Sequence, residues 1–130
     1  MTCPDRGATF VPATEFETIA LRDLDAMPDE ERDALPFGVV GFAADTSVHR
    51  YNATEARLSG LDPATVVSVP FFDAVAQCMN NFMVAQRFED EPRIDDIVPY
   101  VLTLRMRPTK VRLRLLAQPE MPRRYVLIER

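Results

Sequence analysis

The sequence predicts a single α+β domain in which a five-stranded antiparallel sheet is flanked by short helices and one longer helix. The alternating apolar and polar residues typical of half-buried strands occur in two segments before residue 52 and in three after residue 99. Between them, apolar residues recur at helical intervals over residues 70–90. The composition fits one globular domain, because 47% of the 130 residues are hydrophobic and 27% are charged.

The first 34 residues are expected to form an N-terminal arm and two cap helices. Residues 1–13 contain two prolines and a glycine without periodicity, which predicts a mobile arm. Thr14 and Glu17 have the spacing of a capping box, so a short helix is predicted there. A second helix is predicted from Pro28, because acidic residues fill the first turn of "PDEERDAL".

The main domain is expected to span residues 35–130. Its first feature is a β-hairpin from Phe37 to Tyr51, in which two strands surround the turn-like "AADTS". Asn52, and the "DP" pair that begins at Asp62, are typical helix starts and predict two short helices.

The second half of the main domain is expected to contain helices and then three strands. "PFFDAVAQC" and "NNFMVAQRFED" have helical periodicity, with a break at the asparagine pair 80–81. The charged segment "EPRIDD" is predicted to be a loop. Strands are predicted for "YVLTLRM", "KVRLRLL" and "RRYVLIER", the second with one wet and one buried face.

Composition excludes several classes of protein. The net charge of −5 and the pI of about 4.9 oppose nucleic-acid binding, which needs a basic patch. No apolar run approaches the roughly 20 residues that cross a bilayer, and the N-terminal segment lacks signal-peptide features, so a cytoplasmic protein is expected. Cys3 and Cys78 do not make a disulfide framework, and His49 is the single histidine, which excludes zinc-type spacing.

Three side chains in the main domain carry chemistry. Tyr51 and Glu55 stand four positions apart, across a strand end and the next helical turn, so both can converge on one atom. Glu55 also has the capping-box spacing from Asn52, and the two roles compete for one side chain. Cys78 taken singly is more often a buried small hydrophobe, although a position just before an asparagine-capped helix favours a reactive thiolate.

Several segments resemble the photoactive yellow protein family of the PAS-domain superfamily. The resemblance runs from about Leu35 to residue 130 and includes "LPFGVVGF", "YNATEARLSGLDP", "VPFFDAVAQC" and "RMRPTKVRL". The "PTKV" match and the spacing among Tyr51, Glu55 and Cys78 are its most specific parts. The resemblance implies a PAS-like sheet, a fold that carries many unrelated functions.

The resemblance implies a covalent chromophore. In the family, p-coumaric acid is bound as a thioester to the cysteine, here Cys78, and its phenolate lies against the tyrosine and glutamic acid, here Tyr51 and Glu55. Ser59 stands where the family has a threonine whose hydroxyl group supports the tyrosine. The remaining implied chromophore-binding residues are Tyr100 and Met106, for which core packing is an equally good interpretation.

The function implied is that of a blue-light photoreceptor. A buried phenolate needs charge-assisted hydrogen bonds, and Glu55 can donate one only when it is protonated. After trans–cis isomerisation, Glu55 would pass its proton to the phenolate. The carboxylate left uncompensated in the core would loosen the packing and drive a conformational signal.

The sequence departs from the family pattern at several positions. Leu61 replaces an arginine that covers the chromophore, so phenolate stabilisation rests more heavily on Tyr51 and Glu55. Gln77 replaces a proline before the cysteine, and Leu102 replaces an aromatic residue. The segment "EPRIDDIVPY" is about three residues shorter than its family counterpart.

Two other functions are weighed. A PAS-type small-ligand or protein-interaction sensor module, without a photoactive chromophore, would keep the fold and hold another ligand or none. An enzyme using Cys78 as nucleophile and His49 as base lacks an evident orienting group, so no enzymatic activity is expected. The expected partner is a separate downstream signalling protein, with no nucleic acid and no membrane, and the chain is expected to be a monomer or weak dimer.

Overall fold

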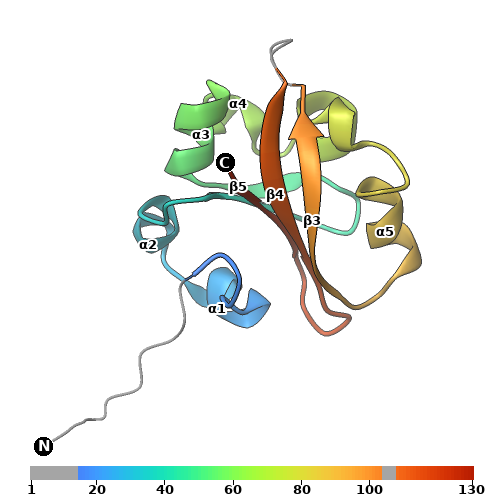
Figure 1. Ribbon diagram of the computed structural model, residues 1–130. Coiled ribbons are helices and arrows are strands. Elements are labelled where there is room, and N and C mark those ends of the chain that lie inside the picture. Colours follow the sequence, from blue (N-terminus) through green and yellow to red (C-terminus); the bar gives the residue numbers. More distant parts are fainter. Residues whose placement is uncertain (1–14, 104–107) are drawn as a thin grey trace, which may run out of the picture.

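The computed structural model describes residues 15–103 and 108–130, and a five-stranded sheet forms its centre (Figure 1). The strands are β1 (Gly38–Phe42), β2 (Val48–Tyr51), β3 (Ile94–Leu102), β4 (Thr109–Ala117) and β5 (Arg124–Glu129). Their order in the sheet is β2-β1-β5-β4-β3, and each neighbouring pair is antiparallel. The predicted α+β class and the five-stranded antiparallel sheet are confirmed.

Short helices fill the remainder of the described chain. They are α1 (Leu21–Ala26), α2 (Asp29–Asp33), α3 (Ala53–Ser59), α4 (Pro63–Val66), the π-helix η1 (Phe71–Val75), the 3-10 helix η2 (Gln77–Met79) and α5 (Ala85–Asp90). The predicted starts of α3 and α4 are confirmed. The Asn52 side chain accepts a hydrogen bond from the Glu55 amide at 3.0 Å, and Asp62 accepts one from the Ala64 amide at 2.9 Å.

The helical segment over residues 70–90 differs from the prediction, because no longer helix forms there. η1, η2 and α5 contain five, three and six residues, and the predicted break at residues 80–81 separates η2 from α5. Asn81 caps the turn before α5, since its side-chain oxygen accepts hydrogen bonds from the amides of Met83 and Val84. The predicted charged loop "EPRIDD" is also wrong in part, because β3 begins within it at Ile94.

The sheet packs on both faces. Val39 and Val40 are neighbours on β1 and point to opposite faces, as successive strand residues do. Val40 belongs to the larger cluster, which contains four phenylalanine rings that each contact at least two of the others: Phe42, Phe71, Phe72 and Phe88. Val39 belongs to a second cluster with Leu21 and Leu24 of α1, so the N-terminal segment covers the other face of the sheet.

The predicted wet face of β4 is only partly wet. The Arg114 side chain is 5% exposed, because Nη1 donates to the carbonyls of Phe16 (3.0 Å) and Ile19 (2.6 Å). Its Nε donates to Asp95 on β3. Arg114 therefore anchors the N-terminal segment on the sheet, and alternation within β4 cannot reveal that distant cover.

The N-terminal segment begins, among described residues, with a turn over residues 15–18 that precedes α1. The predicted arm over residues 1–13 and the predicted capping residue Thr14 lie outside the described residues. The predicted second cap helix is α2, and Pro28 directly precedes it. Within residues 15–103 and 108–130, no helix has both the length and the apolar character needed to span a bilayer.

Candidate functional site

Tyr51 and Ser59 form a buried hydrogen-bonded pair. Tyr51 ends β2 and Ser59 ends α3, and Tyr51 Oη lies 2.8 Å from Ser59 Oγ. Burial raises the pKa of Tyr51 to about 12, although the hydrogen bond with Ser59 acts in the opposite direction. The phenol is therefore protonated at neutral pH, and the predicted support of Tyr51 by a serine hydroxyl agrees with the geometry.

Glu55 lies in the third position of α3 and is 2% exposed. Its carboxylate is bound by the guanidinium group of Arg130, with Nη1 donating to Oε1 at 2.7 Å and Nη2 donating to Oε2 at 3.1 Å. The side chain lies against Gly38 so closely that a Cβ atom there would come within 2.1 Å of Oε1. Burial raises the pKa of the Glu55 carboxyl, and Arg130 opposes that shift.

The capping-box interpretation of Glu55 is wrong. A capping box needs the Glu55 carboxylate to accept from the Asn52 amide, but that amide donates to the Val39 carbonyl. The carboxylate is instead directed to Arg130, the residue that follows β5. Sequence reasoning missed Arg130, because its position beside Glu55 depends on the pairing of β5 with β1 rather than on any local pattern.

Cys78 lies in η2 with a free, half-buried thiol. The Tyr100 hydroxyl group donates to the Cys78 carbonyl, and Asn81 Nδ2 donates to the same carbonyl at 3.2 Å. Asn81 Nδ2 also lies 2.6 Å from the Tyr100 hydroxyl oxygen. Side chains from β3 and from the turn before α5 therefore both hold the backbone carbonyl of Cys78. This pair of hydrogen bonds was not predicted from the sequence.

Three of the predicted site residues, Tyr51, Cys78 and Tyr100, belong to or pack against one hydrophobic cluster. Tyr51 is a member of the larger cluster, and Leu61, Cys78 and Tyr100 pack against it. Leu102 is also a buried member of that cluster. Met106 lies outside the described residues, so its predicted role stays a prediction.

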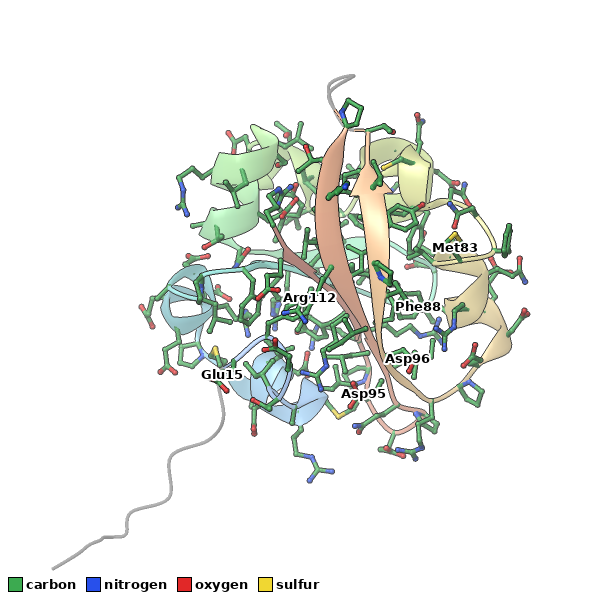
Figure 2. All side chains as sticks on the ribbon, in the orientation of Figure 1. Glu15, Met83, Phe88, Asp95, Asp96 and Arg112 are labelled. Atoms are coloured by element: carbon green, nitrogen blue, oxygen red, sulfur yellow. The ribbon has the colours of Figure 1, made fainter. Side chains whose placement is uncertain are left out.

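Two apolar residues in the turn between η2 and α5 lie at the surface. Phe82 is 79% exposed and Met83 is 42% exposed, whereas Met79 in η2 is buried. Figure 2 shows Met83 and the buried Phe88 on the α5 side of β3. Met83 instead borders an apolar groove of about 540 Å³, lined also by Pro99, Tyr100, Val101, Lys110 and Val111.

The comparisons with known proteins first establish the class of the fold. No family model matches the sequence. The PAS domain of an HTR-like protein from Haloarcula marismortui superposes with a TM-score of 0.61 at 15% identity, over 85% of this chain and 98% of that chain. The fold is therefore that of a PAS domain.

Closer relatives then give the family. The chain is 32% identical over 92 residues to photoactive yellow protein from Halochromatium salexigens, covering 68% of this chain and 74% of that protein. The corresponding protein from Rhodothalassium salexigens is 30% identical over the same coverage. The photoactive yellow protein domain of the sensor histidine kinase Ppr from Rhodospirillum centenum superposes with a TM-score of 0.77 at 32% identity, over 84% of this chain and 98% of that domain. The chain belongs to the photoactive yellow protein family.

Proposed function

We propose that this protein is a blue-light photoreceptor that binds p-coumaric acid as a thioester on Cys78. The observation that carries the proposal is the arrangement of Tyr51 and Cys78 on one hydrophobic cluster, with the buried Glu55 four residues from Tyr51, in a member of this family. Sensor domains of this kind act by binding and conformational change, so we infer signalling rather than enzymatic catalysis.

The residues present fit the chemistry of a phenolic acid thioester. Cys78 supplies a free thiol at the margin of an apolar cluster, which suits an aromatic acyl group. Tyr51 supplies a phenol whose pKa is raised to about 12, so at neutral pH it is protonated and can donate a hydrogen bond. Glu55 supplies a buried carboxyl whose raised pKa favours proton uptake.

When bound, p-coumaric acid would supply a double bond that isomerises from trans to cis in light and a phenolate oxygen that accepts a proton. Tyr51 would donate a hydrogen bond to that oxygen, while Ser59 keeps the Tyr51 hydroxyl group in place. Glu55 would donate its carboxyl proton after isomerisation. The resulting carboxylate lies beneath α3 and beside β1, so a change in its charge acts directly on packed elements.

The signal would pass to a downstream signalling protein in the cytosol. We infer a protein rather than a nucleic acid as the receiver, because the net charge of −5 disfavours contact with a phosphate backbone. The change in charge at Glu55 would reach such a partner through rearrangement of the helices around the sheet.

One observation favours the second candidate function, a PAS-type sensor of another small ligand. The apolar groove beside Tyr100 has a volume within the ordinary range of ligand sites, and both carboxylate oxygens of Glu55 are bound by Arg130. A repurposed domain would use that groove and leave Cys78 unmodified.

The test is incubation of the purified chain with an activated p-coumaric ester. The thiolate of Cys78 attacks the acyl carbon and the ester's leaving group departs, so we expect a yellow protein with one added coumaroyl group. Cys78→Ala should stay colourless, while the matched variant Cys3→Ser should colour normally. Absence of an adduct on Cys78, or an adduct that does not respond to blue light, would favour the second candidate.

A further inference from the structure

Among the ion pairs of the described residues, the pair between Glu55 and Arg130 is the most deeply buried. The Glu55 side chain is 2% exposed and the Arg130 side chain 18% exposed. Two nitrogens of one guanidinium group bind the two oxygens of one carboxylate, at 2.7 and 3.1 Å. This forked geometry gives both strength and orientation, which a point charge does not.

The geometry defines the protonation state of Glu55 in the chromophore-free chain. Two guanidinium nitrogens donate to the two carboxyl oxygens, which is the geometry of a bidentate arginine–carboxylate pair. This geometry favours the carboxylate form of Glu55 in the chromophore-free chain. The proposed function requires the opposite state, a neutral Glu55, before light arrives.

The surroundings of Glu55 offer few other charges. Tyr51, at the end of β2, is the second titratable group that interacts electrostatically with Glu55. The charge of Glu55 raises the pKa of Tyr51, and the charge of Arg130 lowers it. β1 faces Glu55 with Gly38, which has no side chain. Within the described chain, the charge of Glu55 is thus balanced by Arg130.

We propose that Arg130 is the counterion of the Glu55 carboxylate that forms in the pocket after proton transfer. It holds the Glu55 carboxylate in the chromophore-free chain, releases it when Glu55 takes up a proton beside a bound phenolate, and binds it again after Glu55 returns that proton to the phenolate oxygen. The inference rests on the proposed function for its light-dependent half. No electron is exchanged, because a single proton moves between a carboxyl and a phenolate oxygen.

Two consequences follow from this assignment. The carboxylate produced by light is compensated rather than isolated, so Arg130 lengthens the life of the signalling state. The family resemblance implies an arginine at the position of Leu61, which is uncharged. In this chain the positive charge is supplied by Arg130, which follows β5, the central strand of the sheet.

The first test needs no chromophore. Carbon-13 NMR follows the Glu55 carboxyl carbon through a pH titration in the wild type and in the variants Arg130→Gln, Arg130→Lys and Arg57→Gln. We expect a carboxylate at neutral pH in the wild type and titration at higher pH in Arg130→Gln. Arg130→Lys should lie between them, because lysine keeps the charge and loses the fork. Arg57→Gln removes a charge from the exposed side of α3 and should leave the titration unchanged.

The second test uses the loaded protein and a flash of blue light. Recovery in the dark should be about tenfold faster in Arg130→Gln than in the wild type, which corresponds to about 1.4 kcal/mol less stabilisation of the carboxylate state. An unchanged Glu55 titration in Arg130→Gln overturns the counterion assignment whether or not the chain takes a chromophore. A changed titration with unchanged recovery overturns the light-dependent half, and a chain that forms no adduct removes that half together with the proposed function.

Discussion

The substitution Gly38→Ala probes the Glu55 pocket most sharply, because a single methyl group there meets the carboxylate. A Cβ atom on Gly38 would lie 2.1 Å from Glu55 Oε1 and 3.0 Å from Cδ, where ordinary contact begins near 3.4 Å. The carboxylate has to move by about 1.3 Å, which is enough to disturb the hydrogen bond that Oε1 accepts from Arg130 at 2.7 Å. The backbone at Gly38 can accept alanine, because Gly60 is the only described glycine that has a positive φ.

The expected loss of stability follows from the ion pair. Overpacking of a tight site typically costs about 1–3 kcal/mol, and separating a buried charge from its partner costs about 3–5 kcal/mol. Glu55 can limit the second cost by taking up a proton, as its raised pKa favours. We therefore expect Gly38→Ala to lower the free energy of unfolding by about 2–4 kcal/mol at neutral pH.

Urea unfolding of the chromophore-free chain measures this effect, and the Glu55→Ala background is its matched control. With the carboxylate removed, the methyl group has room, and alanine replaces glycine at little cost because it restricts the unfolded chain. We expect a coupling energy of about 2 kcal/mol or more between the two substitutions. Equal losses in both backgrounds would refute it, because the methyl group would then be clashing with something other than Glu55.

Three further predictions concern other parts of the site and its support. Tyr51 has a folded-state pKa of about 12 against an ordinary value of 10, so stability should fall as pH rises from about 10 towards 12; Tyr51→Phe should flatten that decline in urea midpoints, and an equal decline would contradict the assignment. Arg114→Met should lower the free energy of unfolding by about 2–3 kcal/mol and speed proteolysis in the N-terminal segment, and unchanged proteolysis would show that this segment is anchored elsewhere. Asn81→Ala should speed alkylation of the Cys78 thiol, measured by peptide mass spectrometry, while the control Asn80→Ala should not; equal rates would show that the Asn81 hydrogen bond does not restrain the backbone at Cys78.

The parts of the fold that local chemistry determines were predictable from the sequence. Asn52 and Asp62 cap α3 and α4 because their side chains reach amides two or three residues away. The β1–β2 hairpin forms between adjacent segments, so its strands and turn could be identified by alternation alone.

The parts that depend on distant segments were not predictable in the same way. Arg130 reaches Glu55 because β5 pairs with β1, although the two residues are 75 positions apart in sequence. Arg114 is buried because the N-terminal segment covers β4, which alternation within the strand cannot indicate. Phe82 continues an apolar helical period, yet it falls in the turn between η2 and α5 and points to solvent.

The measurement that tests the central claim most directly is a light-minus-dark infrared difference spectrum of the loaded protein, compared with that of Glu55→Gln. We expect that the carbonyl stretch of a protonated carboxyl disappears on illumination while a carboxylate band appears, and that both changes vanish in Glu55→Gln. An adduct on Cys78 that isomerises while both bands stay constant would contradict it, because Glu55 would then take no part in moving the proton.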